Sequence, residues 1–269
     1  MSSDSISFDL AVGFYDQTRG FPLGEERAVA ELFVEAGGLD RASRVLEVGV
    51  GTGRIALPLA PHVAQYVGVD LSRPMMEHLR AKQTGEPVTV LQGDITQLPL
   101  RDRAFQAVVA VHVFHLVPGW RMALAEVGRV LAPRGLLLVG RNDSDRRPEE
   151  EVLWDAWHSE IPRERTTAVG VPRERSDLFP LDEGWMQVGK PLVHSFATTR
   201  TLRAFFERME KRIWSSSWQL TDDEIARGLA AVRAAAKAND LDLDASFEHE
   251  QRFSVRAYRP PGHRAESAE

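Results

Sequence analysis

The chain contains no cysteine among its 269 residues. Disulfides, thiolate nucleophiles and cysteine zinc sites are therefore excluded. An excess of basic residues is missing as well, because 33 Lys and Arg stand against 39 Asp and Glu, which gives a formal net charge of −6. A broad nucleic-acid surface requires clustered positive charge. The sequence therefore predicts no nucleic-acid partner.

Long apolar runs are also lacking. No window approaches the roughly 18 apolar residues of a membrane-spanning helix. The opening MSSDSISFDL has neither the basic nor the apolar region of a signal peptide. We therefore expect no membrane insertion and a cytoplasmic location. The content of 43% hydrophobic and 27% charged residues is typical of a globular protein.

Short apolar strands alternate with helices between about residues 40 and 142. The expected strands cover 44–48, 65–69, 87–92, 106–111 and 135–141, and the expected helices cover 52–60, 73–82 and 120–131. Ser72 is the expected cap of the second helix, and Pro74 stands in its first turn. This alternation is typical of parallel βαβ units. It predicts an α/β fold with a doubly wound, Rossmann-like, mostly parallel sheet.

The flanking segments predict a helical lid and a closing strand. Helices are expected near 25–36 and 149–160 and over 199–212 and 221–238, with a strand over 188–196. An antiparallel final strand is expected near the end of the chain. We expect one domain over 1–269, with 40–142 as the ligand-binding core, 1–38 and 143–245 as lid and specificity elements, and 247–259 as the final strand.

The segment LEVGVGTGRI places Gly49, Gly51 and Gly53 behind the acid Glu47. Glycines between two ordered elements predict a close approach to the backbone. A dinucleotide fingerprint would need glycine where Arg54 stands, and a P-loop would need a lysine followed by Ser or Thr. An acid beside such a loop, with no basic partner, instead favours a positively charged ligand group.

Two further acids stand at the ends of neighbouring strands. Asp70 ends the second expected strand, where a carboxylate can accept hydrogen bonds from both ribose hydroxyls. Asp94 can receive an adenine amino group while Ile95 lies against the ring. With Glu47, these residues predict an adenosine that carries a cationic amino-acid tail, which is S-adenosylmethionine.

The chain resembles the class I S-adenosylmethionine-dependent methyltransferases, and among them the type 11 family that includes quinone-biosynthesis C-methyltransferases. The resemblance rests on LEVGVGTGRI, VGVDLSRPMM, LQGDITQLPL, FQAVVAVHVFHLVP and VGRVLAPRGLLLV in the family's order. Arg134 stands where the family usually has a glycine. FYDQTRGFP resembles a segment that these proteins place over the cofactor. The resemblance covers about residues 14–142 and is weak beyond them.

The resemblance also implies which residues contact the cofactor. Glu47 and the three glycines would face its methionine part, and Asp70 would bind the ribose. The other implied contacts are Leu71 and Met75 beside the adenine, Asp94 and Ile95 at the adenine edge, Val111 through its backbone, and Tyr15 and Arg19 over the methionine end.

Two histidines follow the fourth expected strand, at the edge where open α/β sheets bind ligands. His112 and His115 are candidates for a general base where the methyl acceptor must lose a proton. We expect His115 rather than His112 to face the pocket. Packing of one histidine against the sheet and a turn position for the other is the structural alternative.

The acids have structural alternatives too. Glu47 could pair with Arg44 or Arg54 on the surface, and the other two acids could only cap the turns that follow them. Both alternatives remain open from the sequence.

The sequence therefore predicts a methyltransferase that carries a methyl group from S-adenosylmethionine to O, N or C of a small organic molecule. We expect a monomer or a homodimer and no metal, because the fourth strand ends in Val111, His112 and Val113 rather than in acids. A protein of the same fold that catalyses a non-methylating reaction, or that only binds the cofactor, remains the alternative. A nicotinamide oxidoreductase is disfavoured by Arg54.

Overall fold

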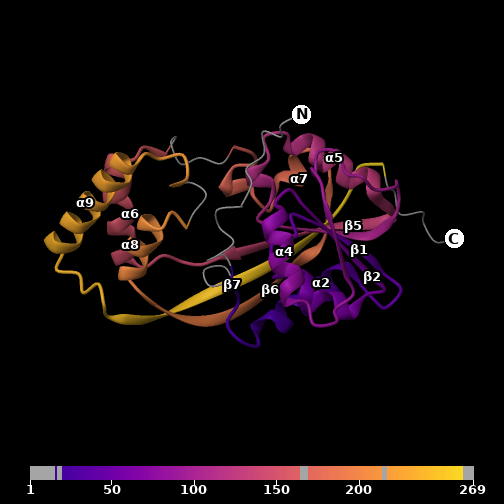
Figure 1. Cartoon of the computed structure of the whole chain (residues 1–269), viewed down its shortest axis with the longest axis horizontal. Coiled ribbons are helices and arrows are strands. Elements are labelled where there is room, and N and C mark those ends of the chain that lie inside the picture. The colour runs from indigo at the N-terminus through magenta and orange to yellow at the C-terminus, as the bar shows by residue number, and fades with distance from the viewer. Residues whose placement is uncertain (1–15, 17–19, 164–168, 214–216, 263–269) are drawn as a thin grey trace. The chain divides into compact units, whose positions relative to one another are not determined.

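The computed structural model describes residues 16, 20–163, 169–213 and 217–262 (Figure 1). These residues form two compact units. Unit 1 comprises the described residues of 1–142, 169–194 and 253–269, and unit 2 comprises those of 143–168 and 195–252. Unit 1 therefore contains the predicted core of 40–142. The extents predicted for the single domain, its lid and its final strand remain predictions.

The strands form a seven-stranded sheet in the order β3-β2-β1-β4-β5-β7-β6, mostly parallel with one antiparallel strand, as predicted. The strands are β1 (Arg44–Val48), β2 (Gln65–Asp70), β3 (Val88–Gln92), β4 (Phe105–Val111), β5 (Leu131–Asp143), β6 (Met186–Thr201) and β7 (Ser246–Arg259). The strand order reverses between β1 and β4. Ligands of open α/β sheets bind at such a reversal, outside the carboxyl ends of the strands.

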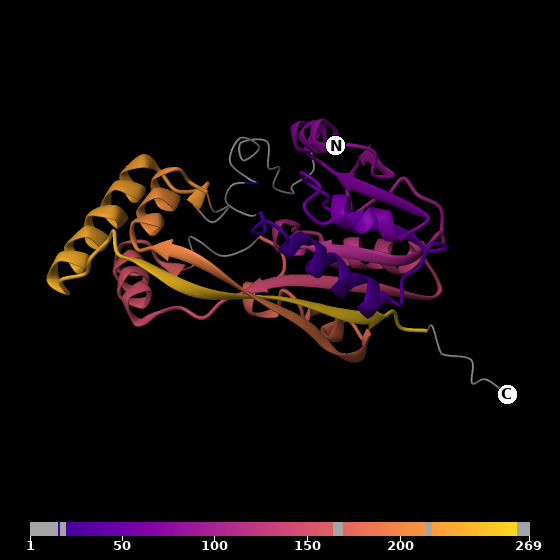
Figure 2. The same cartoon turned by 90° about the horizontal axis from the view of Figure 1, so that it is seen from below.

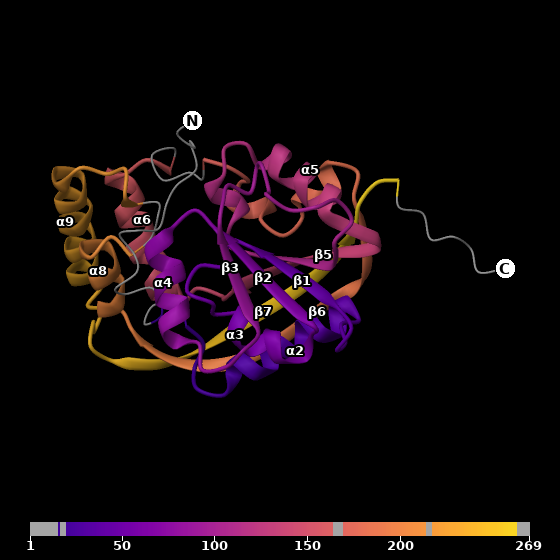
Figure 3. The ribbon, with the colours of Figure 1, turned by 45° about the vertical axis from the view of Figure 1, so that its right-hand side comes forward.

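The register brings the ends of the central strands together. Val48 at the end of β1 lies opposite Val69 of β2 and Ala110 of β4. Asp70 in turn lies opposite Gln92 at the end of β3. Figure 3 shows β1, β2 and β3 side by side. Because these strands are parallel, the residues that follow each of them meet at one edge of the sheet.

Helices cover the sheet of unit 1 because its central strands are apolar on both faces. They are α2 (Glu25–Gly37), α3 (Ala56–Leu59), α4 (Arg73–Lys82), α5 (Trp120–Val130) and α7 (Phe179–Asp182), with short 3₁₀ turns η2 (Ala60–His62), η3 (Phe114–Leu116) and η5 (Arg173–Arg175). The ring of Phe33 in α2 lies 5.9 Å from that of Phe253 in β7. Figure 2 shows the indigo helix α2 beside the yellow strand β7. Helix α4 begins as predicted, because the Ser72 hydroxyl accepts a hydrogen bond from the Met75 amide at 3.3 Å.

Two predicted helix starts are wrong. The helix expected over 52–60 begins only at Ala56, because Gly53 has φ +79° and cannot continue a right-handed helix. The helix expected over 199–212 is α8 (Arg203–Glu210), because β6 extends to Thr201. In both cases, residues whose local sequence pattern favours a helix belong instead to the loop or strand that precedes the helix.

Unit 2 contains three helices in its described part, α6 (Pro148–Glu160), α8 and α9 (Asp222–Ala238), which Figure 1 labels. Helix α9 begins at the predicted cap, where the Thr221 hydroxyl accepts from the Glu224 amide at 3.2 Å. A Cβ on Gly228 of α9 would lie 2.6 Å from the buried ring of Trp157 in α6. Glycine therefore permits the close approach of these two helices.

None of the helices in the described ranges combines the length and the apolar character needed to cross a membrane.

Arg134 occupies the turn at the start of β5 with φ +68°, a left-handed conformation that favours glycine. Its side chain is exposed, so a substitution loses little packing. We expect Arg134→Gly to raise the free energy of unfolding by about 0.5–1 kcal/mol, since a left-handed non-glycine residue costs about 1–2 kcal/mol and glycine adds chain entropy to the unfolded state. Thermal denaturation of Arg134→Gly and Arg134→Ala separates the relief of backbone strain from the loss of the arginine side chain. Alanine retains the Cβ, so stabilisation by alanine as large as that by glycine would contradict the role of φ.

Candidate active site

The glycine loop after β1 adopts left-handed conformations at all three glycines. The φ angles are +73° at Gly49, +53° at Gly51 and +79° at Gly53. A Cβ on Gly49 would lie 2.6 Å from the Val113 side chain, and one on Gly53 would lie 2.7 Å from that of Leu79. The sequence predicted a close approach of other groups to the glycine backbone. At two of the three glycines, side chains of the protein itself make that approach. A Cβ on Gly51 would lie 3.5 Å from the Met75 methyl group, which is an ordinary contact.

Asp70 joins the glycine loop to the start of α4. Its Oδ2 accepts a hydrogen bond from the Gly51 amide and its Oδ1 accepts one from the Ser72 amide, both at 2.8 Å. Asp70 therefore does cap the turn that follows it, as the structural alternative from the sequence stated. This capping does not exclude ligand binding, because each carboxylate oxygen can accept a second hydrogen bond.

The predicted adenine contacts lie at the same sheet edge. Asp94 is half-buried, and its Oδ1 accepts from the amide and the hydroxyl of Thr96, both at 2.8 Å. Ile95 and Met75 are buried, with 5% and 2% of their surfaces exposed. The remaining predicted positions in this part are half-buried Leu71 and buried Val111. Tyr15 and Arg19 lie outside the described residues.

Glu47 is buried beneath the loop rather than paired on the surface. Only 2% of its surface is exposed, and its Oε2 accepts a hydrogen bond from the Tyr66 hydroxyl at 2.8 Å. Burial raises the pKa of Glu47 to about 8, although the Tyr66 hydrogen bond and the charge of Arg54 oppose the shift. The carboxyl group is therefore mostly protonated at neutral pH in the ligand-free protein.

The raised pKa predicts a pH-dependent stability. Between its ordinary value of 4.5 and about 8, the folded protein retains a proton that the unfolded chain releases. The free energy of unfolding therefore falls as pH rises through this window, by at most about 1.4 kcal/mol per pH unit from this group. Glu47→Gln removes the titration. We expect its stability relative to the wild type to increase steadily across the window in urea denaturation.

Glu126 provides a control, because its pKa is shifted in the opposite direction to that of Glu47. Its hydrogen bonds with Arg129 lower its pKa, so the group is ionised throughout the upper part of the same window. The stability difference between Glu126→Gln and the wild type should stay constant there. A constant difference for Glu47→Gln would contradict the proposed protonation.

The sequence gave no role to Asp16, although it stands inside FYDQTRGFP. Its carboxylate accepts hydrogen bonds from the Thr52 hydroxyl at 2.5 Å and from Lys82 Nζ at 2.6 Å, and lies 3.0 Å from His78 Nε2. Burial opposes ionisation, but the hydrogen bonds from Lys82, Thr52 and His78 outweigh it and lower the pKa of Asp16. Asp16 is therefore hydrogen-bonded both to Thr52 of the glycine loop and to Lys82 of α4. The feature of the sequence that could have indicated this role is the position of Asp16 next to Tyr15, a predicted cofactor contact.

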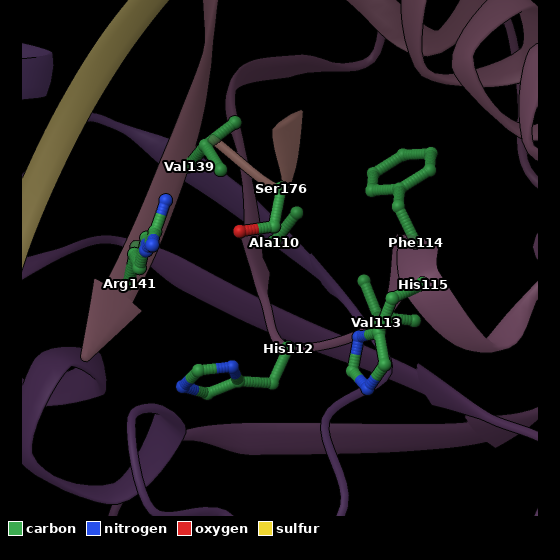
Figure 4. A pocket seen from close by; sticks show the side chains of 9 residues that line it. Ala110, His112, Val113, Phe114, His115, Val139, Arg141 and Ser176 are labelled. Carbon is green, nitrogen blue, oxygen red and sulfur yellow. The ribbon is translucent and has the colours of Figure 1, made fainter. Parts of the chain in front are cut away.

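A pocket opens at the end of β4 (Figure 4). Its nine lining residues are Ala110, His112, Val113, Phe114, His115, Val139, Gly140, Arg141 and Ser176. Both predicted histidines therefore line one pocket, with ring centroids 6.4 Å apart and planes at 90°. Figure 4 shows Arg141 and the Ser176 hydroxyl on the same pocket.

The His112 ring is oriented by groups that the sequence did not indicate. Its Nε2 lies 3.1 Å from the Asn142 side-chain oxygen, which also accepts from Arg54 at 3.3 Å. Since arginine can only donate, the shared atom is an acceptor, and His112 Nε2 therefore carries a proton. In the neutral ring this leaves Nδ1 as the basic nitrogen. The backbone of His112 has φ +53°, a strained conformation that is enriched at functional sites.

A buried ion-pair network positions the other wall of the pocket. Asp177 is 5% exposed and accepts from Arg141 at 2.9 Å and from Arg256 at 2.8 Å. The Tyr258 hydroxyl donates to its backbone carbonyl. Burial opposes ionisation of Asp177, but its hydrogen bonds with both arginines hold its pKa below the ordinary value. The network fixes Ser176, which precedes Asp177, at the pocket wall.

Comparison with known proteins identifies the class. Residues 46–139 match the family described as a methyltransferase domain. Phosphatidylethanolamine N-methyltransferase of Cereibacter sphaeroides is 37% identical over 141 residues, which are 48% of this chain and 69% of that protein. The chain belongs to the class I S-adenosylmethionine-dependent methyltransferases. The narrower similarity to quinone-biosynthesis enzymes remains a prediction.

Other relatives match over part of their length or only in fold. Phthiotriol/phenolphthiotriol dimycocerosates methyltransferase 1 of Mycobacterium ulcerans (strain Agy99) is 37% identical over 116 residues, which are 42% of this chain and 41% of that protein. The chain thus spans less than half the length of that relative. The [4+2]-cyclase SpnF has 20% identity and a TM-score of 0.55, with 95% of this chain and 94% of SpnF covered. This likeness shows the fold alone.

The residues at the sheet edge fit the cofactor that this class implies. Half-buried carboxylates at Asp70 and Asp94 provide acceptors for hydroxyl and amino groups. Buried apolar side chains at Met75 and Ile95 suit an aromatic ring. Glu47 supplies a buried carboxyl group that a cationic ligand would favour in its ionised form.

Proposed function

We propose that the protein transfers the methyl group of S-adenosylmethionine to a small organic or lipid acceptor. The observation that carries the proposal is the position of two features at neighbouring strand ends within unit 1. The Asp70–glycine loop follows β1 and β2, and the pocket of His112 and His115 follows β4. A cofactor held at the first feature would have an acceptor pocket beside it.

The cofactor supplies a methyl group activated by a sulfonium ion. In the proposal, Asp70 binds its ribose, and Asp94 with Ile95 holds its adenine. Glu47 releases its proton when a positive charge approaches, because an opposite charge stabilises the carboxylate. Binding should therefore release a proton near neutral pH, which calorimetry in buffers of different ionisation enthalpy detects.

The pocket side chains would orient the acceptor and receive its proton. Positioning supplies much of the acceleration in a two-reactant displacement. Where the acceptor must lose a proton, His112 is a candidate base, and Asn142 orients its ring through Nε2. His115 is the second candidate base, from the same pocket. The Ser176 hydroxyl can hydrogen-bond a polar acceptor atom.

The relatives and the lining of the pocket support a proposal for the class of acceptor. One relative is named for phosphatidylethanolamine and another for dimycocerosates. Apolar residues such as Phe114 and Val139 line the pocket together with the polar groups. An amphipathic acceptor suits this lining, with methylation at O, N or C. We keep the predicted monomer or homodimer within the proposal.

Binding and product analysis test the proposal together. Calorimetry should show binding of S-adenosylmethionine and S-adenosylhomocysteine and no comparable binding of NAD. Incubation with S-adenosylmethionine and a panel of metabolites and lipids should yield one product heavier by a methyl substitution, with S-adenosylhomocysteine formed in equal amount. Tight NAD binding without a response to S-adenosylhomocysteine would overturn the assignment.

A non-methylating reaction is the second candidate function. A fold does not by itself determine the reaction, and a protein of this fold, SpnF, is named as a [4+2]-cyclase. In that case S-adenosylmethionine would bind without being consumed, and the product would have the mass of the substrate. Product mass and S-adenosylhomocysteine yield therefore distinguish the two candidates.

A further inference from the structure

Glu47 and Tyr66 form a buried pair beneath the glycine loop. Tyr66 has none of its surface exposed, and Glu47 has only 2%. The Tyr66 hydroxyl donates a hydrogen bond to Glu47 Oε2 at 2.8 Å. Within the described residues this is the one hydrogen bond that the Glu47 carboxyl group makes. The bond engages Oε2, so Oε1 remains available to a ligand.

The register of β1 and β2 explains why these two side chains meet. Tyr66 lies opposite Val45, and Glu47 lies opposite Gly68. Side chains two residues apart on a strand point to the same face of the sheet, so Glu47 shares the face of Val45 and Tyr66. Gly68 has no side chain, and a Cβ there would lie 2.6 Å from the Val50 side chain. The tyrosine therefore reaches Glu47 diagonally across the two strands.

The hydrogen bond favours the ionised form of Glu47. Burial raises the pKa of Glu47 to about 8, the Tyr66 hydrogen bond opposes this shift more than the charge of Arg54 does, and the charge of Asp70 adds to it. Burial and the nearby Glu47 raise the pKa of Tyr66 well above its ordinary value, so its hydroxyl keeps its proton and acts as the donor. Such a donor can hold a carboxyl group whose own charge changes.

The place of the pair in the fold connects it with ligand binding. A buried carboxyl group lowers stability relative to an apolar side chain, and the Tyr66 hydrogen bond only reduces that loss. Glu47 stands two residues before Gly49, the first glycine of the loop. The strand that carries Tyr66 ends at Asp70, which accepts a hydrogen bond from the Gly51 amide at 2.8 Å. The pair therefore lies where the charged part of the cofactor is proposed to bind.

We propose that Tyr66 is a positioning residue for S-adenosylmethionine, which it affects through Glu47. Its hydroxyl holds Oε2, and Oε1 accepts a hydrogen bond from the cationic amino group of the ligand. When the ligand binds, the O–H bond at Oε1 breaks, the proton passes to solvent, and the carboxylate keeps the electron pair. Tyr66 keeps its own proton throughout. This inference rests on the proposed contact of Glu47 with the cofactor.

The pH dependence of cofactor affinity tests the proposal. The Kd of S-adenosylhomocysteine is measured by calorimetry in the wild type and in Tyr66→Phe from about pH 6 to about pH 9, a range that brackets the titration of Glu47. We expect Tyr66→Phe to weaken binding about tenfold or more near neutral pH, because Glu47 loses a hydrogen bond that favours its ionised form. The ratio of the two Kd values should fall as pH rises, since less of the carboxyl group is then protonated. Titration of the ligand's own amino group cancels in this ratio.

Val45→Ala is the matched control. Val45 lies beside Tyr66 in the register and is also fully buried. Its truncation disturbs packing on the same face and leaves the hydrogen bond in place, so any loss of affinity should be equal at every pH. A second control combines Tyr66→Phe with Glu47→Gln, which has no titrating carboxyl group. In that background Tyr66→Phe should leave the pH dependence of binding unchanged.

Two results would overturn the role of Tyr66 and leave the proposed function intact. One is a wild-type affinity in Tyr66→Phe near neutral pH. The other is a loss of affinity that is equal at every pH, which indicates packing alone. In both cases the wild type binds S-adenosylhomocysteine. A wild type that fails to bind it at any pH refutes the proposed function and this inference together.

NMR of the ligand-free protein gives a readout that needs no cofactor. The carboxyl carbon of Glu47 should titrate at a higher pH in Tyr66→Phe than in the wild type, and an unchanged titration overturns the proposal. If Tyr66→Phe fails to fold, the hydroxyl proton of Tyr66 in the wild type decides. Its signal should move downfield when S-adenosylhomocysteine binds and Glu47 ionises, and an unmoved signal overturns the proposal.

Discussion

Replacement of His115 by alanine is expected to lower kcat on the order of 10²–10⁴-fold if the acceptor must lose a proton to that ring. Cofactor affinity should stay near that of the wild type, because His115 lies in the pocket after β4 and not on the glycine loop. Single-turnover rates together with calorimetric cofactor binding measure the two quantities separately. A smaller loss with a raised KM would mean that His115 only positions the acceptor.

The same measurement on His112→Ala decides which histidine is the base. Asn142 accepts a hydrogen bond from His112 Nε2 and so fixes the orientation of that ring. If His112 is the base, Asn142→Ala should also reduce kcat, since the ring would lose its orientation. His62→Ala serves as the control, because His62 lies in η2 before the amino end of β2. Full activity of both pocket variants would refute a histidine base and leave positioning as the source of catalysis.

Asp70→Ala is expected to weaken binding of S-adenosylhomocysteine by more than about tenfold. Loss of a carboxylate that accepts from hydroxyls costs about 1.5–3 kcal/mol. The variant should also unfold at a lower temperature, because the amides of Gly51 and Ser72 lose their acceptors. Affinity is therefore measured by calorimetry at a temperature where the variant is fully folded.

Asp40→Ala separates ligand binding from turn capping. The Asp40 carboxylate also caps a turn, accepting from the Ala42 amide at 3.0 Å and the Ser43 hydroxyl at 2.8 Å. It precedes the amino end of β1, at the sheet edge opposite the glycine loop. Its loss should lower stability and leave cofactor affinity unchanged. Wild-type affinity in Asp70→Ala would show that Asp70 is only a cap.

The order of most strands and helices was predictable because the signals for them are local. Apolar strand runs, the Ser72 cap and the Thr221 cap each act within a few residues, and each is found where the sequence places it. The α/β class followed from the alternation of these elements. Helix starts at 52 and 199 were mispredicted because Gly53 and the extension of β6 depend on packing with neighbouring elements.

The sequence by itself determined the fold class, the glycine loop and the acids at the ends of the strands. Only the tertiary structure decided how these residues behave. The Val113 side chain closely approaches Gly49, and the Tyr66 hydroxyl donates to the buried carboxyl group of Glu47. Likewise, only folding brings Asn142 to His112. The physical reason is that burial and partners set pKa values and hydrogen bonds, and these depend on residues that are distant in sequence and adjacent in space.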